Sequence, residues 1–332
     1  RSTPPEDAQQ IAKVTIERLR HLDLDALIVY DIDDESDRNP DDRPFPYLPT
    51  QDPGDFHALH LTDWDRPVVV YRCVGKYDPT DLEYLSVGEL PPVEFVGLAA
   101  DLGCRAVSIG PAATEVLDEL AGVLADRGVT ISLGEGCVVV PELDVARHVP
   151  LLETFARLGV TRINTLSFDR DVARSVDQLS ALAELAAGYG METTIETSRG
   201  FVPTDLAAMV EVQRAIGRSD VRLLLDTMHV TRSGARPTDI AALDPAIVGY
   251  VQLCDVPLKS TRELSYLDEA MYDRKAPGDG ELPLFELLSA VRRDVVVGLE
   301  VPNRAASASL EALSEHLRRS VAAARALLDR LD

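Results

Sequence analysis

Short apolar runs alternate with longer Ala- and Leu-rich segments from about Leu82 to the end of the chain. The short runs have the length of buried strands, and the longer segments have the length of helices. The run VRLLLD at 221–226 is an example: it ends in an acid, and a histidine follows three residues later. This pattern predicts strands at 82–87, 105–110, 129–134, 161–168, 192–197, 221–226, 248–254 and 295–301.

The segments between these runs predict the connecting helices. Several of them begin with a capping residue or a first-turn proline. Eight alternations within about 250 residues are the pattern of a (β/α)8 barrel. A doubly wound sheet would also alternate, but no glycine-rich phosphate fingerprint follows any strand. The expected fold class for residues 81–332 is therefore α/β, a (β/α)8 TIM barrel, with helices at 91–103, 113–127, 147–158, 172–189, 204–217, 237–244, 283–292 and 307–330.

Residues 1–80 have a different pattern and are expected to form an N-terminal α/β extension. An amphipathic helix is predicted at 5–22, and buried strands are predicted at 27–32 and 68–74. The acidic, proline-rich loop between the two strands is too long and too polar for a packed interior. Two strands and one helix cannot close a barrel, so the extension is expected either to pack on the domain that follows or to be only marginally stable.

The composition, with 45% hydrophobic residues, is typical of a soluble globular protein. A net charge of −23 disfavours nucleic acid and anionic membranes as partners, and it is compatible with a divalent cation. No apolar run approaches the roughly 18 residues that a membrane helix needs. The four cysteines form no C-x-x-C pair, so reduced thiols in a cytoplasmic protein are expected.

Acidic and amide side chains stand at or beside the predicted ends of several strands. In a barrel, these ends converge on one mouth. Carboxylate and amide oxygens are hard ligands suited to Mg2+, Mn2+ or a similar divalent ion. Without a cation, that many acids in one place would force some to be protonated. The side chains in question are Glu135, Glu196, Asp226, Gln252, Asp255 and Glu300.

The segment from Leu82 to the end resembles the sugar phosphate isomerase/epimerase family, the xylose-isomerase-like barrels. Five motifs carry the resemblance, and they occur in the family's order. They are TTIET (193–197), LLLDTMHVTRSG (223–234), YVQLCDVP (250–257), RKAPGDGELPL (274–284) and GLEVPN (298–303). The resemblance implies a metal site, in which Mn2+ or Mg2+ is expected first and Co2+ or Zn2+ are alternatives. The ligands that it implies are Glu196, Asp226, Gln252 and Glu300.

The same resemblance implies roles for the other residues. His229 and Arg274 are expected to contact the substrate's oxygens, while Glu196 and Glu300 move protons. Two further candidates for substrate contact are Lys259 and Glu135. A divalent ion on a substrate carbonyl and its neighbouring hydroxyl acidifies the adjacent C–H, so that a carboxylate can remove the proton. Return of the proton gives an epimer or an isomer, whereas loss of a β-hydroxyl gives a dehydration product.

Gln252 departs from the pattern of many sugar epimerases in this family, which have histidine there. Glutamine resembles the branch that includes 3-dehydroshikimate dehydratases. The expected function is a metal-dependent isomerase or epimerase of a sugar, a sugar phosphate or another small polyhydroxy compound. The alternatives are a metal-dependent dehydratase of the 3-dehydroshikimate or inosose type, which is a lyase, and a non-catalytic barrel module. The family also implies a homo-oligomer.

The extension itself resembles the early part of the methylenetetrahydrofolate reductase barrel. The similar stretches are LDALIVYDIDDESDRN (24–39), RPFP (43–46) and RPVVVYRCVGK (66–76). They correspond to two or three strands of that fold. The parts that would complete a flavin and folate site have no counterpart, so a working reductase is not expected.

Overall fold

The structure is a computed structural model of the 332-residue chain. It describes the backbone of residues 27–33 and 68–74, and residues 81–88, 90–141, 144–260 and 264–331. The chain divides into two compact units, Arg1–Lys76 and Tyr77–Asp332.

In the first unit, strands β1 (Leu27–Asp33) and β2 (Val68–Val74) pair in parallel. This confirms the two strands predicted there. The helix predicted at 5–22 and the acidic loop lie outside the described residues.

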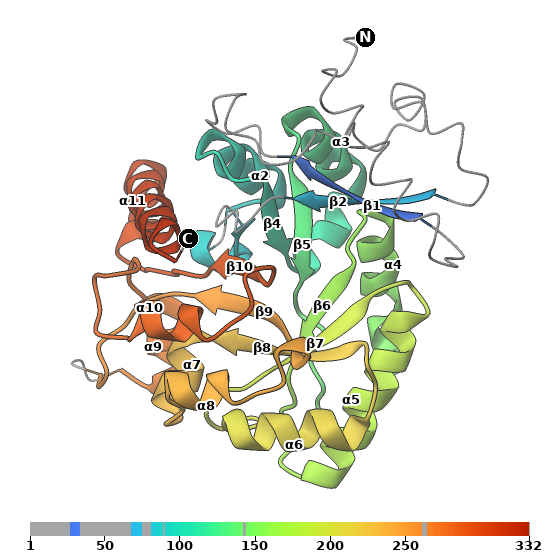
Figure 1. The fold of residues 1–332 in the computed structure, drawn as a ribbon. Helices are drawn as coiled ribbons and strands as arrows, with labels where there is room; N and C mark the ends of the chain where they lie inside the picture. Colours follow the sequence, from blue (N-terminus) through green and yellow to red (C-terminus); the bar gives the residue numbers. More distant parts are fainter. Residues whose placement is uncertain are drawn as a thin grey trace. The chain divides into compact units, whose positions relative to one another are not determined.

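The second unit is a closed barrel of parallel strands (Figure 1), which confirms the predicted fold class. The first strand of the barrel pairs with both the second and the last, and this pairing closes the ring. In chain order the strands are β3 (Asp81–Leu82), β4 (Ala106–Ile109), β5 (Thr130–Gly134), β6 (Arg162–Thr165), β7 (Glu192–Glu196), β8 (Val221–Asp226), β9 (Val248–Leu253) and β10 (Val296–Leu299).

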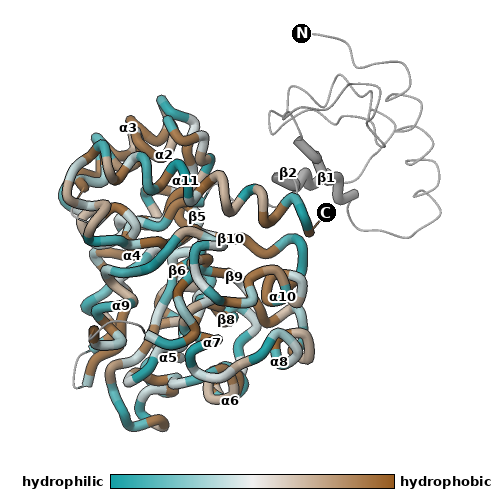
Figure 2. Tube along the Cα trace, turned by 90° about the vertical axis from the view of Figure 1, so that its left-hand side faces the viewer, coloured by the Kyte–Doolittle hydropathy of each residue, from teal (hydrophilic) through white to brown (hydrophobic). Residues whose placement is uncertain are grey.

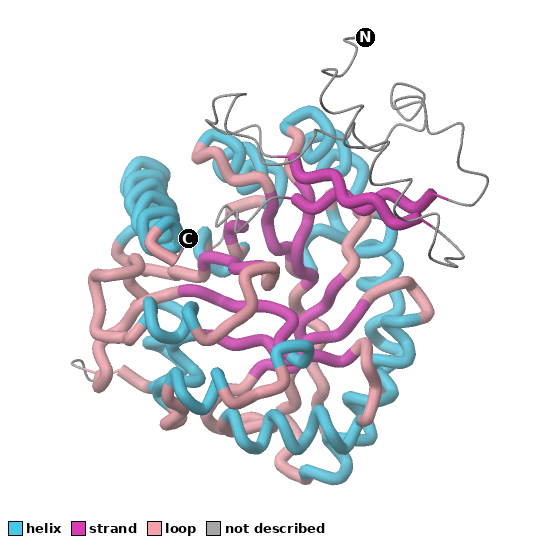
Figure 3. The backbone as a smooth tube through the Cα atoms, in the orientation of Figure 1, coloured by secondary structure: helices cyan, strands magenta, loops and turns pink. Residues whose placement is uncertain are grey.

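Helices surround the strands, as the colouring of Figure 3 shows. Hydrophobic and hydrophilic residues alternate along the last helix in Figure 2, because one of its faces packs on the barrel. Among the described residues, no helix is long and apolar enough to cross a membrane. The helices are α2 (Pro92–Asp101), α3 (Leu117–Arg127), α4 (Val149–Arg157), α5 (Val172–Ala187), α6 (Leu206–Ile216), α7 (Thr227–Arg232), α8 (Pro237–Ala241), α9 (Tyr266–Tyr272), α10 (Leu284–Ser289) and α11 (Leu310–Asp329).

The first barrel strand differs from the prediction. The expected strand at 82–87 ends already at Leu82, and Tyr84–Val87 form a 3-10 turn, η4. Side-chain hydrogen bonding favours the turn, because the Ser86 hydroxyl donates to the Leu299 carbonyl (3.0 Å) and accepts from the Val301 amide (2.8 Å). The apolar run therefore packs as a turn, and Glu83 stands at a strand end.

Two separate apolar clusters support the barrel. The larger one lies between strands and helices, whereas a small inner cluster of Leu133, Leu224 and Tyr250 is fully buried. Successive strand residues alternate between these two sides. The inner cluster fills the barrel beneath the strand ends, so the polar residues that follow it are confined to the mouth.

Gly298 in β10 provides a test of this inner packing. A Cβ atom at this position would overlap the Glu83 carboxyl group and the Tyr250 hydroxyl. We expect Gly298→Ala to lower the unfolding free energy by about 1–3 kcal/mol, because this crowded interior cannot relax. Urea denaturation measures the change.

Gly122→Ala is the matched control, because an added Cβ at this position in α3 meets nothing within 4 Å. It should be neutral, or stabilising by at most about 1 kcal/mol, through helix propensity. Equal effects of the two substitutions would contradict the packing described for Gly298.

Candidate active site

The strand ends bring the predicted acids and the predicted amide to one mouth. Asp226 ends β8 and pairs in register with Gln252 of β9. Glu196 ends β7, and Glu135 and Glu300 directly follow β5 and β10. All five side chains are buried, and none of these residues is more than 8% exposed. The structure therefore brings these five residues together, and their roles stay predictions.

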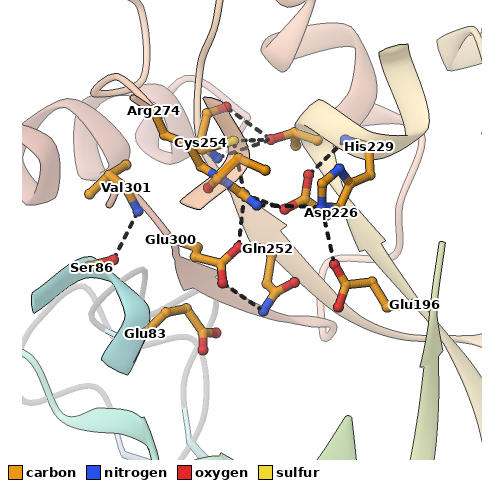
Figure 4. Close-up of polar contacts among 12 residues, drawn as sticks. Glu83, Ser86, Glu196, Asp226, His229, Gln252, Cys254, Arg274, Glu300 and Val301 are labelled. Atoms are coloured by element: carbon orange, nitrogen blue, oxygen red, sulfur yellow. Dashed lines mark hydrogen bonds and ion pairs between the residues drawn. The ribbon is translucent and has the colours of Figure 1, made fainter. Parts of the chain in front are cut away.

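Arg274 is the cation at the centre of the cluster (Figure 4). Its Nη1 forms an ion pair with Asp226 Oδ2 and a second one with Glu300 Oε2 at 2.8 Å. Its Nε donates to the Ala270 carbonyl at 2.7 Å, and the residue is 3% exposed. The guanidinium therefore neutralises two strand-end carboxylates and is held by a backbone oxygen behind it.

The loop that carries Arg274 is organised by Asp255. This buried carboxylate accepts hydrogen bonds from the amides of Gly278 (2.9 Å) and Leu282 (3.0 Å). The backbones of Asp255 and Lys275 also exchange two hydrogen bonds. Asp255 therefore positions the loop and does not contact the guanidinium, which agrees with the Pro- and Gly-rich sequence of a turn.

Asp226 and His229 are joined by a helix cap. Asp226 Oδ1 accepts from the His229 amide at 2.7 Å, which is the usual N-cap contact and explains their spacing of three residues. The His229 ring reaches Tyr266 Oη through Nδ1 (2.5 Å). Its Nε2 lies 3.5 Å from both Arg274 Nη2 and Glu196 Oε1.

The tautomer of His229 follows from these contacts. Burial lowers the pKa of His229 to about 4, so the ring is neutral at pH 7. Arginine can only donate, so Nε2 accepts from Arg274 and the hydrogen of Nδ1 points to the Tyr266 oxygen. The lone pair of Nε2 therefore faces the Arg274 guanidinium.

Two amides link the glutamates around the mouth. Asn164 Nδ2 donates to Glu196 Oε2 (2.6 Å) and to Glu135 Oε2 (3.3 Å). Gln252 Nε2 donates to Glu135 Oε1 (3.0 Å) and to Glu300 Oε1 (3.5 Å). The amide oxygen Oε1 of Gln252 is buried, and no described residue supplies it with a hydrogen-bond partner. It is therefore a free ligand atom inside the cluster.

The cluster holds more acid than Arg274 alone can neutralise. Burial raises the pKa of Glu196 to about 8 and the pKa values of Glu135 and Glu300 well above their ordinary range. Burial would also raise the pKa of Asp226, but the positive charge of Arg274 holds it below its usual value. The mouth is therefore a strongly proton-attracting, and equally cation-attracting, environment.

A divalent cation fits the donors that the mouth presents. Glu196, Asp226 and His229 each offer a ligand atom, and these atoms lie within 4.8 Å of one another. The unpartnered amide oxygen of Gln252 is a further oxygen donor beside them. Carboxylate, imidazole and amide donors together suit Mn2+, Zn2+ and similar ions.

The sequence pattern does not indicate three residues that lie at the site. It predicts Glu83 inside a strand, an amide in RINT is a weak signal for Asn164, and Tyr266 belongs to a short helix that the pattern does not predict. An acid within the apolar run DLEYL was the available signal for Glu83. Lys259, a predicted substrate contact, is exposed in the loop after β9 and lies outside the buried cluster.

Comparison with known proteins identifies the fold family. The family model described as "Xylose isomerase-like TIM barrel" matches residues 96–323, more than half of the chain. The chain belongs to this family. This confirms the resemblance of the barrel, whereas the reductase-like segment at 1–80 lies outside the matched residues and stays a prediction.

One curated relative and two solved structures illustrate the similarity. A Streptomyces coelicolor protein named "Putative hydroxypyruvate isomerase" is 26% identical over an alignment of 255 residues, and the match covers 64% of this chain and 86% of the relative. The zinc-bound IolI protein has a TM-score of 0.61 at 19% identity, over 76% of this chain and 96% of its own. AsbF of Bacillus anthracis is described as the probable 3-DHS dehydratase of petrobactin synthesis. It has a TM-score of 0.61 at 15% identity, over 73% of this chain and 97% of its own.

The raised pKa of Glu196 predicts how stability depends on pH. Its pKa is about 8 in the folded protein against an ordinary 4.5, so the folded state keeps a proton that the unfolded chain loses between these values. With a chelator present, the unfolding free energy should fall as pH rises through this window. Glu196→Gln should flatten the decline, measured by urea denaturation at pH 5 and at pH 8.

Glu211→Gln is the control, because this glutamate is exposed on α6 and pairs with Arg214 at the surface. It should leave the slope of the wild-type protein unchanged. If Glu196→Gln and Glu211→Gln showed the same pH dependence, the buried acid would not be the cause.

Proposed function

We propose that this protein is a divalent-metal-dependent isomerase or epimerase that acts on a sugar or another small polyhydroxy ketone. The observation that carries the proposal is the buried network in which Arg274 pairs with Asp226 and Glu300 while His229 lies against Glu196. A mouth that attracts a cation, and that also holds the carboxyl groups of Glu196 and Glu300, is suited to removing a proton next to a carbonyl. The relative named as a hydroxypyruvate isomerase supports this reaction class.

The metal would be held by Glu196, Asp226, Gln252 and Glu300, as the motif resemblance implies. Ligand atoms of Glu196 and Asp226 lie within 4.8 Å of each other and of a ring nitrogen of His229. A zinc ion in the similarly folded IolI protein supports this assignment. When bound, the ion supplies positive charge that polarises a carbonyl oxygen.

The two glutamates are the proposed proton carriers. Glu196 and Glu300 come from different strands, and the strands of Asp226 and Gln252 lie between them in the barrel. One carboxylate can therefore remove a proton from a small substrate, while the other faces the substrate from a different side. Burial raises the pKa values of both glutamates, to about 8 for Glu196, and a carboxyl group with a raised pKa can return a proton that it has accepted.

Arg274 and His229 are the proposed orienting residues. The fixed guanidinium donates hydrogen bonds only, so it selects substrate oxygens. The neutral His229 ring is held by Tyr266 from the side opposite the acids. Together they would define which carbon of the substrate faces each glutamate.

A dehydratase is the second candidate. Gln252, in place of the histidine of many sugar epimerases, favours it, and the fold similarity to AsbF is compatible with it. Both reactions begin with proton removal at the same carboxylates. Product analysis separates them, because an isomer keeps the mass of the substrate and a dehydration product has lost water.

Turnover assays test the proposal directly. With Mn2+ present, the protein should isomerise or epimerise hydroxypyruvate or D-fructose, whereas loss of water from 3-dehydroshikimate would favour the dehydratase. Glu196→Gln and Glu300→Gln should each lower kcat by roughly a hundredfold or more, because an amide cannot accept the proton. The exposed substitution Glu211→Gln is the control and should not change kcat. Full activity of Glu300→Gln would remove this residue from the mechanism.

A further inference from the structure

We propose that Glu83 is an additional substrate-binding residue, whose carboxyl oxygen Oε2 forms a hydrogen bond with a hydroxyl group of the substrate beside the carbon that Glu300 faces. The inference rests on the proposed function, since it takes the substrate to be a polyhydroxy compound. It assigns to the first barrel strand a part in recognition that none of the sequence motifs suggested.

The strand register places Glu83 beside Glu300. Leu82 pairs with Leu299 across β3 and β10, and the Glu83 amide donates to the Leu299 carbonyl at 3.1 Å. The residues that follow the two strands therefore leave the barrel at the same level. Neighbouring strands are about 4.8 Å apart, so one small sugar can reach both carboxyl groups. Figure 4 shows the Glu83 side chain on the same side as Glu300 and Gln252.

The two oxygens of Glu83 have different surroundings. Oε1 accepts a hydrogen bond from the Tyr250 hydroxyl at 2.6 Å. Glu83 is only 1% exposed, and Oε2 forms no hydrogen bond within 3.5 Å with any described residue. Burial raises the pKa of Glu83, and the nearby Ser108 hydroxyl and the Tyr250 hydroxyl oppose this shift. A buried polar atom without a partner costs about 1–3 kcal/mol. A substrate hydroxyl supplies the missing partner, as donor to a carboxylate or as acceptor from a carboxylic acid.

The position of this carboxyl group is fixed by its surroundings. Tyr250 is fully buried in the inner cluster, and its hydroxyl also lies 3.3 Å from Ser132 Oγ. On the neighbouring strand, Gly298 leaves room for both Glu83 and Tyr250, since any side chain there would overlap them. The hydrogen bond from Tyr250 therefore fixes Oε1, and the crowding at Gly298 restricts rotation of the whole carboxyl group, Oε2 included.

Glu269 provides a contrast elsewhere in the molecule. It is 3% exposed and also has a buried Oε2 without a described partner, but its Oε1 pairs with Arg232 at 2.8 Å between α7 and α9. That ion pair joins two helices on the outside of the barrel. Glu83 instead receives a neutral hydroxyl and faces the strand ends, where the other acids of the site lie.

Equilibrium binding of D-fructose and its monodeoxy analogues tests the assignment. Calorimetry should show that removal of one particular hydroxyl weakens binding to the wild-type protein by roughly tenfold or more. In Glu83→Gln, which keeps an acceptor for Tyr250, the same removal should cost less than about threefold. Glu269→Gln is the matched control and should retain the full wild-type penalty. Thermal unfolding confirms that the variants are folded.

Each outcome decides a different point. An equal penalty in wild type and Glu83→Gln for every hydroxyl, or no binding of D-fructose to the wild-type protein, would overturn the assignment of Glu83. A changed penalty in Glu83→Gln, together with no turnover of any of the three compounds, would support the contact and count against the proposed function alone. A lowered unfolding temperature with an unchanged penalty would make Glu83 a structural residue.

Discussion

The ion pairs of Arg274 with Asp226 and Glu300 are the constraint on which the site depends. Buried carboxylates are tolerated only when they are paired, protonated or bound to a cation. One guanidinium neutralises two of them, while Glu135, Glu196 and Glu83 are left to hydroxyl and amide partners. The mouth therefore contains more carboxyl groups than positive charges, and their burial raises the affinity of these groups for protons and for metal ions.

The barrel supplies the rigidity that this arrangement needs. Strand ends fix the acids, the Asp226 cap fixes the start of α7, and Asp255 fixes the loop that returns Arg274 to the mouth. Below them, Leu133, Leu224 and Tyr250 are fully buried. The acids of the mouth therefore lie on an apolar support, where the electrostatic effect of each charge on its neighbours is strong.

Much of the fold and of the site could be predicted, because both follow from simple periodicities. Alternating apolar runs locate the strands, and acids at strand ends such as Glu196 and Asp226 identify the mouth. The first strand could not be predicted correctly, because Ser86 uses its hydroxyl to stabilise a turn within an apolar run. Glu83 was therefore assigned to the interior of a strand. Asn164 and Tyr266 act through tertiary contacts that no local pattern indicates.

A divalent ion and Arg274 would contact the same carboxylates, Asp226 and Glu300, so their positive charges oppose each other. Calorimetric titration with Mn2+ tests this claim most directly. We expect about one ion per wild-type chain and no binding by the double variant Asp226→Asn and Glu300→Gln. Arg274→Met should strengthen the binding by roughly tenfold or more. Arg232→Met, which removes a buried arginine paired with Glu269, should leave the affinity unchanged. Absence of Mn2+ binding to the wild-type protein, or weaker binding by Arg274→Met, would contradict the account.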